Sequence, residues 1–132
     1  SSKNYPIKLK YTKKNFPIEI IQEYNQWREV KDFEGNKGWI HKSLLKGERY
    51  ALADSKNKML LVYNKPNGKL IGEIGNYNIV KLKKCLKNWC QINIEEARGW
   101  SHKRDLWGVY QDEIFNIPIY QPVINQFWKI SF

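Results

Sequence analysis

The sequence has few acidic side chains and no long apolar run. Its 132 residues hold 13 Asp and Glu against 23 Lys and Arg, a formal net charge of +10 at pH 7. No apolar stretch approaches the roughly 18 residues of a membrane-spanning helix, so we expect no transmembrane span. The positive charge favours polyanionic partners, such as nucleic acid, anionic lipid headgroups or acidic envelope polymers. An A/T-rich coding bias toward Lys, Ile and Asn is an alternative source of this charge.

Common catalytic motifs are also missing. The sequence contains no Gly-rich phosphate-binding loop, no HExxH zinc motif and no GxSxG nucleophile elbow. The adjacent carboxylates Glu95 and Glu96 fall in a predicted turn, where we interpret them as a solvated loop. We therefore predict no catalytic residues, no cofactor and no enzymatic activity.

The sequence does contain an internal repeat. GWIHKSLL at 38–45 and GWSHKRDL at 99–106 share five identical positions, and each pair lies 61 residues apart. Upstream, Trp27 corresponds to Trp89 at a distance of 62 residues. A fixed period with a drifting spacer is typical of a duplicated domain. Each half has about 50–60 residues, a size that is only marginally stable alone, so we expect the halves to support each other.

Helical periodicity is hard to find, whereas short alternating segments rich in β-branched and aromatic residues recur. Turn signals separate these segments. The pattern predicts an all-β fold made of many short strands, a small barrel or sandwich. One 3-10 turn is expected after each Gly-Trp strand, over 43–45 and 104–106. The predicted strands are 17–24, 26–31, 38–41, 58–63, 75–83 and 88–94.

The order of these motifs resembles a known family. Ile/Val-x-Ile/Leu, turn, x-Trp-x-x-Val/Ile, turn, Gly-Trp-x-His and a short Leu-ended turn are similar to the bacterial SH3 domain, in the tandem form of exported alphaproteobacterial proteins. Residues 16–53 and 60–113 carry this pattern. The resemblance implies two tandem SH3-like β-barrels and a non-catalytic role in binding or anchoring, often at the cell wall. It also implies a periplasmic or otherwise extracytoplasmic location, with a signal peptide removed.

The repeat and the resemblance suggest three parts: SH3-like domain 1 at 1–53, SH3-like domain 2 at 54–113, and a C-terminal extension at 114–132. Almost nothing precedes Pro6, the match to Pro66 of the second repeat, so the first barrel is expected to lack its opening strand. The extension has one charge and five aromatic residues, so we expect it to pack on the barrels. Part of 117–130 either pairs with an open barrel edge, in this or a neighbouring chain, or fills the junction between barrels.

Cys85 and Cys90 flank the predicted turn at 87–88. Strand–turn–strand geometry can bring their Cα atoms within the roughly 4.4–6.8 Å that a disulfide needs. An exported protein would form this bond, and two separate buried thiols are the alternative. A zinc site with His41 and His102 is not expected, because the histidines occupy equivalent positions in different barrels.

Strand alternation identifies the candidate ligand site. Trp27 points away from Val30, and Trp89 away from Ile92, so apolar packing of Val30 and Ile92 would put both indoles on the outer face. Core packing is the alternative for each tryptophan. We hypothesise a shallow groove on each barrel that binds a peptidoglycan glycan or peptide. The candidate ligand-binding residues are Trp27, Trp39, Trp89, Trp100, Trp107, Tyr24 and Tyr63, and the basic rim is Lys42, Lys83, Lys84 and Lys103.

Two other functions remain open. Small barrels also bind single-stranded nucleic acid through aromatic residues in a basic groove, with strong salt dependence. A module that only assembles proteins is the third hypothesis. The expected partner is a cell-wall polymer or an envelope protein, and the expected state is a monomer or a weak homo-oligomer.

Overall fold

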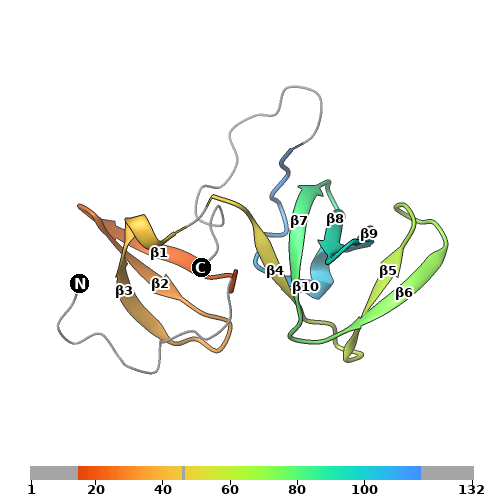
Figure 1. Ribbon diagram of the computed structural model, residues 1–132, viewed down its shortest axis with the longest axis horizontal. Coiled ribbons are helices and arrows are strands. Elements are labelled where there is room, and N and C mark those ends of the chain that lie inside the picture. The colour runs from red at the N-terminus through yellow and green to blue at the C-terminus, as the bar shows by residue number, and fades with distance from the viewer. Residues whose placement is uncertain (1–14, 46, 117–132) are drawn as a thin grey trace.

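The computed structural model describes residues 15–45 and 47–116. Within these ranges the chain forms two antiparallel sheets, with strand orders β1-β2-β3 and β10-β4-β7-β8-β9-β5-β6. The two sheets stand side by side along the long axis (Figure 1). The predicted all-β class is confirmed. The elements are β1 (Glu19–Tyr24), β2 (Trp27–Lys31), β3 (Lys37–His41), the 3-10 turn η2 (Lys42–Leu44), β4 (Tyr50–Ala53), β5 (Met59–Tyr63), β6 (Leu70–Gly75), β7 (Ile79–Cys85), β8 (Trp89–Ile94), β9 (Ala97–His102), the 3-10 turn η3 (Lys103–Asp105) and β10 (Leu106–Trp107).

The sequence repeat is a repeat of structure. The order β1, β2, β3, η2 returns as β7, β8, β9, η3. In each copy an apolar residue of the first strand pairs with a β-branched residue of the second, which pairs with a glycine of the third. A bulge interrupts the first pair of strands at the same place in both. The aligned rows are Ile20, Val30 and Gly38 in the first copy, and Leu82, Ile92 and Gly99 in the second.

The one-residue drift of the repeat lies in the turn before the third strand. In the first copy, the Asp32 carboxylate accepts hydrogen bonds from the backbone N–H groups of Glu34 (3.0 Å) and Asn36 (2.8 Å). Gly35 supplies the positive φ, 90°, that this loop requires. Five residues, 32–36, separate the paired Lys31 and Lys37, whereas four, 94–97, separate the equivalent pair Asn93 and Arg98. An Asp-centred loop therefore accommodates the extra residue.

The second sheet includes a strand that the sequence analysis did not predict. β4 pairs with β7 on one side and with β10 on the other. Alanine has low strand propensity, but Ala51, Leu52 and Ala53 are all buried. Burial in the sheet therefore outweighs propensity. Residues 50–53, predicted to end domain 1, are instead joined by their strand pairing to the second unit.

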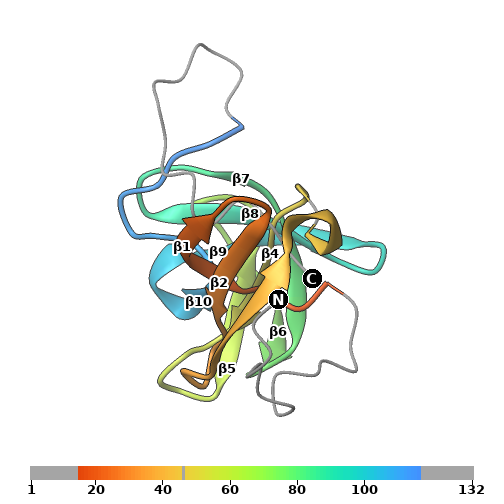
Figure 2. The ribbon, with the colours of Figure 1, turned by 90° about the vertical axis from the view of Figure 1, so that its left-hand side faces the viewer.

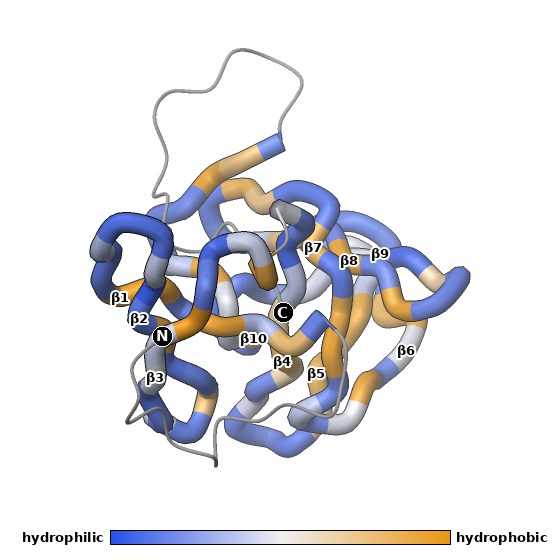
Figure 3. Tube along the Cα trace, turned by 60° about the vertical axis from the view of Figure 1, so that its left-hand side comes forward, coloured by the Kyte–Doolittle hydropathy of each residue, from blue (hydrophilic) through white to orange (hydrophobic). Residues whose placement is uncertain are grey.

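Each unit has its own apolar core, and the second is larger. The first core consists of Ile18, Ile20, Val30 and Ile40, with Leu45 packed against it. Figure 3 shows apolar segments running along β4 and β5 of the second unit, while the connecting loops are mostly hydrophilic. The second core consists of Ala51, Ala53, Leu60, Val62, Val80, Leu82, Cys85, Cys90, Ile92, Leu106, Val109 and Phe115.

The first residues of the C-terminal extension pack on the second unit. The Phe115 side chain is in its core, and the backbone N–H and C=O groups of Phe115 both hydrogen-bond to Cys85 at 3.2 Å. Buried Arg49 holds the preceding segment: its guanidinium contacts the Glu113 carboxylate at 2.5 and 3.0 Å and donates to the Gly108 carbonyl at 2.9 Å. The segment 117–130, proposed to pair with a barrel edge, lies outside the described residues, as does Pro6.

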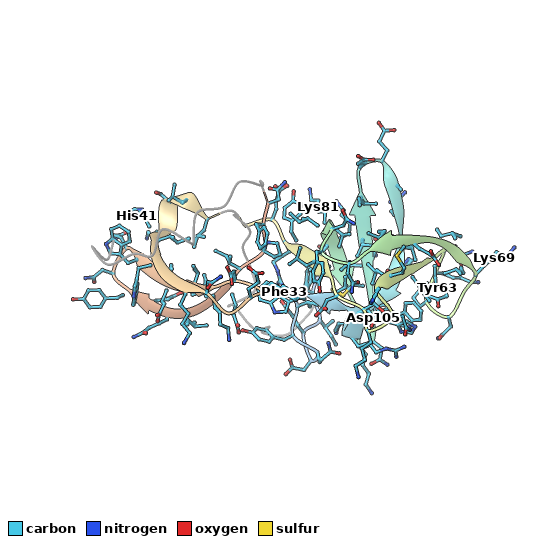
Figure 4. The ribbon with its side chains drawn as sticks, turned by 90° about the horizontal axis from the view of Figure 1, so that it is seen from below. Phe33, His41, Tyr63, Lys69, Lys81 and Asp105 are labelled. Carbon is cyan, nitrogen blue, oxygen red and sulfur yellow. A yellow bond between two sulfur atoms is a disulfide. The ribbon has the colours of Figure 1, made fainter. Side chains whose placement is uncertain are left out.

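The two units contact each other through aromatic side chains. Phe33, from the turn after β2, packs edge-on against Trp107 at 5.7 Å and against Tyr77 at 5.4 Å between ring centroids. The Tyr110 hydroxyl donates a hydrogen bond to the Glu19 carboxylate, and burial together with this bond raises the pKa of Tyr110. Figure 2 shows the first sheet in front of the second, and Figure 4 shows Phe33 between the units.

Gly108 provides a test of how closely the end of β10 approaches β4. Its φ is +129°, and a Cβ there would lie 2.8 Å from the Tyr50 carbonyl oxygen. We expect Gly108→Ala to lower the free energy of unfolding by about 2 kcal/mol, because backbone strain and overlap add. Gly47 has no atom near its Cβ position, so the control Gly47→Ala should change stability by less than about 0.5 kcal/mol. Urea unfolding measures both; equal effects would contradict this account.

Candidate functional site

Strands β5, β8 and β9 place an aromatic cluster on the outer face of the second unit. Trp89 pairs directly with His102, and Tyr63 pairs with Trp100. The Trp89 and His102 rings lie 4.0 Å apart at 33°, and the Tyr63 ring packs edge-on against Trp89 at 5.4 Å. Because directly opposed residues of antiparallel strands share a face, all four side chains project away from the core.

The first unit carries a matching face. Trp27 pairs with Tyr24 on one side and with His41 on the other, and the Trp27 and His41 rings meet edge-on at 5.2 Å. Trp39 lies two residues before His41 on the same strand, so it projects from the same face. Tyr24 is 67% exposed. The sequence candidates Tyr24, Trp27 and Trp39 are therefore brought together.

Trp39 and Trp100 have equivalent surroundings. Both indoles are half-buried. Neither makes a ring contact or hydrogen bond with any other residue of the described ranges. On the same strand, a basic residue precedes each indole by two positions and a histidine follows by two. A residue that can accept hydrogen bonds lies directly opposite on the neighbouring strand. These neighbours are Lys37, His41 and Glu29 around Trp39, and Arg98, His102 and Gln91 around Trp100.

Two of the predicted ligand-binding tryptophans pack against other side chains of the protein. Trp89 faces away from the core, yet it is only 8% exposed because Tyr63 and His102 pack against it. Alternation alone predicts the face of a side chain and does not predict what covers it. Trp107 packs against Phe33 at the junction between the units, away from the other candidates.

The lysines of the predicted basic rim also differ in their exposure to solvent. Lys42 is exposed, and Lys83 and Lys84 are half-buried at the β7 bulge. Lys103, the repeat equivalent of Lys42, is fully buried and cannot belong to a rim. Its ammonium donates hydrogen bonds to three backbone carbonyls, those of Lys87 (2.9 Å), Gln111 (3.1 Å) and Glu113 (2.6 Å).

The burial of Lys103 follows from the chain after β10. Residues 109–113 return over η3 and bring two of the three carbonyls to the ammonium. Burial lowers the pKa of Lys103, and the nearby Glu113 and Asp112 carboxylates oppose that shift. The sequence contains no local signal of this burial, because Lys42 and Lys103 follow the same Gly-Trp-x-His motif.

The two histidines differ in their partners. His41 Nδ1 accepts a hydrogen bond from the Ser43 backbone N–H at 3.1 Å and lies 2.8 Å from the Ser43 hydroxyl. The equivalent of Ser43 is Arg104, and His102 makes no such cap. Burial lowers the pKa of His102 below its ordinary value of 6.5, and Arg104 lowers it further. The shift favours the neutral imidazole.

Cys85 and Cys90 are joined by a disulfide across paired positions of β7 and β8. Both residues are fully buried in the second core. The bond lies at the end of the hairpin where Phe115 pairs with Cys85. It therefore links the two strands of this hairpin at the position where the start of the C-terminal extension pairs with β7.

The family of the chain follows from comparison with known proteins. The family model of the bacterial SH3 domain matches residues 1–47 and 56–108, so the chain belongs to the bacterial SH3 domain family and carries two copies of the domain. No match is found among curated proteins or solved structures. Members of this family are binding modules, often associated with the cell wall. Among the described residues, no helix is long and apolar enough to cross a membrane.

The contrast between Lys103 and Lys42 is testable. Lys103→Met keeps the length of the side chain and leaves three buried carbonyls without their donor, so the free energy of unfolding should fall by about 3 kcal/mol. Lys42→Met, at the equivalent exposed position, should change it by less than about 0.5 kcal/mol. Urea unfolding at neutral pH measures both values, and a small effect at position 103 would contradict the buried role.

His102 predicts a dependence of stability on pH. Because its pKa is lower in the folded protein, the unfolded chain binds more protons as the pH falls below 6.5. The free energy of unfolding should therefore decrease between about pH 7 and pH 5. His102→Gln removes this contribution, so its melting temperature should vary less over that interval than that of the wild type. Identical slopes in the two proteins would contradict the prediction.

Proposed function

We propose that the protein binds a glycan-containing polymer of the cell envelope, such as peptidoglycan, without catalysis. Trp39 and Trp100 are the proposed stacking platforms. The observation that carries the proposal is the duplicated arrangement around these two indoles. The same set of basic, histidine and hydrogen-bonding neighbours surrounds each one, although the rest of the two units differs.

The chemistry of each face suits a sugar ring. An indole presents a flat apolar surface with a negative quadrupole, on which the C–H face of a pyranose can pack. Glu29 and Gln91, directly opposite the indoles, can accept hydrogen bonds from sugar hydroxyls. Lys37 and Arg98, two residues before the indoles, can pair with carboxylates of an acidic sugar or an attached peptide.

The two faces lie at opposite ends of the molecule. Figure 4 shows His41 of the first face and Tyr63 of the second far apart, with Phe33 between them. The aromatic contacts of Phe33 with Trp107 and Tyr77 hold the units together. Two weak sites on one chain would bind a repetitive polymer more tightly than either site alone.

The charges of the first face favour a glycan over nucleic acid. Glu29 lies directly opposite Trp39, where a base stacked on the indole would have to lie. Its carboxylate would repel phosphates there. Lysines elsewhere on the surface still predict weak, salt-sensitive binding to any polyanion.

An extracytoplasmic location is part of the proposal. The Cys85–Cys90 disulfide supports it, because such bonds persist in the periplasm and outside the cell and are rare in the cytosol. Access to the cell wall requires the same location.

Sedimentation with insoluble peptidoglycan across a salt series tests the proposal. We expect retention that survives high salt, because stacking depends little on ionic strength. Trp39→Ala and Trp100→Ala should each weaken retention by about tenfold, and the double variant by more than either. Ile71→Ala is the control, since Ile71 is an exposed apolar residue of β6, outside both aromatic faces and outside the junction.

A fluorescent single-stranded oligonucleotide, titrated under the same conditions, separates the alternatives. Tight oligonucleotide binding without retention on the wall would reverse the assignment in favour of nucleic acid. Release of soluble wall fragments during incubation would contradict a purely binding role. Equal retention of the wild type and the double tryptophan variant would show that neither face is the site.

A further inference from the structure

The second unit has an opening between β6 and the β8–β9 hairpin, called the slot here. It lies on the face of β9 that points away from the Trp100 side chain. Residues 97–99 of β9 pair only with β8, since β5 pairs with β9 at a single position, Tyr63 with Trp100. β6 is the last strand of the described sheet order. In Figure 1 the β5–β6 hairpin extends away from β7, β8 and β9. Backbone groups of the exposed residues 97 and 98 therefore lack a strand partner on one side within the described chain, whereas Gly99 is buried against Val62 and Tyr63 of β5.

The slot is apolar inside. A cavity of about 170 Å³ separates β6 from the β8–β9 hairpin, with the core residues Val62 and Ile92 among those lining it. Ile71, on β6, contributes to its wall although it is 53% exposed. Exposed β-branched side chains over a cavity that reaches the core provide a surface that a partner's apolar side chains can cover. The remaining apolar walls are Ile74, Ile94 and Ala97.

The rim of the slot is acidic in a basic protein. Glu73, Glu95 and Glu96 line the hollow that continues from the cavity toward the β8–β9 turn. Arg98 is the one basic residue among the cavity-lining residues of the described chain. The chain as a whole carries a net charge of +10. A cationic peptide is therefore repelled by most of the surface and attracted at this rim.

We propose that this slot binds an extended peptide with alternating apolar and basic residues, added as a strand beside β9. Alternation would direct the apolar side chains of the peptide into the cavity and its basic side chains toward the three glutamates. Backbone groups of 97 and 98 would supply hydrogen bonds. Gly99 and Trp100 project to opposite sides of β9, so the slot and the second glycan face use different sides of the strand and share only Arg98.

NMR titration with a short peptide of alternating lysine and isoleucine tests the slot. We expect shifts of the backbone amides of Ile71, Ala97 and Gly99, and none at Trp39. Ile71→Thr should weaken binding about fivefold, because it removes apolar area while keeping strand propensity. Leu70→Thr is the matched control: Leu70 is the neighbouring residue of β6, is 48% exposed and lies outside the cavity lining.

The charge of the rim is tested separately. Glu96→Gln should weaken binding of the lysine peptide at low salt by about threefold, whereas Glu34→Gln, in an exposed turn of the first unit, should not. A peptide with glutamate in place of lysine should bind more weakly than the lysine peptide. Equal binding of the two peptides, equal effects at positions 70 and 71, or shifts confined to the aromatic faces would each overturn the proposal. Self-association abolished by Ile71→Thr would assign the slot to a second copy and overturn it as well.

Discussion

The inward direction of Val30 and Ile92 is the constraint on which both binding faces depend. Val30 lies on β2, between β1 and β3, and Ile92 lies on β8, between β7 and β9 of the larger sheet. Each is fully buried between an apolar partner on one strand and a glycine on the other. Because side chains alternate along a strand, fixing these two inward places Glu29 and Gln91 outward. The indoles opposite them, Trp39 and Trp100, then have to project outward too. A register slip of one residue would exchange the core with the binding face in either unit.

The two copies differ mainly in what the chain does outside the repeated sheet. In the second unit, β4 and β10 extend the sheet, and the segment through Glu113 returns over η3. The buried pair of Arg49 and Glu113 joins the entry of this unit to its exit. This additional chain buries Lys103 where Lys42 stays exposed. The same short motif thus carries a structural lysine in one copy and a surface lysine in the other.

The second unit also presents two surfaces of opposite character on the two sides of β9. The outer side carries Trp100 with Arg98 and His102, a flat aromatic face with positive charge. The inner side of β9, at residues 97–99, faces the apolar slot and its acidic rim. A strand that is paired fully on one edge and partly on the other makes this possible, because incomplete barrel closure leaves an opening to the core. Glycan binding and peptide binding can therefore use opposite sides of one strand, with Arg98 next to both sites.

Local pattern determined much of this protein. The Gly-Trp-x-His repeat, the alternation of strands and the turn residues were sufficient for the all-β class, the duplication, the presence of the 3-10 turns and the outward side of Trp27 and Trp89, because these depend on neighbours within a few residues. Contacts between distant segments decided the rest. Residues 50–53 form strand β4 because they are buried against β7. Trp107 packs against Phe33 at the junction between the units, and Tyr63 covers Trp89. The Lys103 ammonium is buried and donates hydrogen bonds to the carbonyls of Lys87, Gln111 and Glu113 instead of to water. Burial and hydrogen bonding depend on which segments meet in space, and no local sequence pattern specifies that meeting.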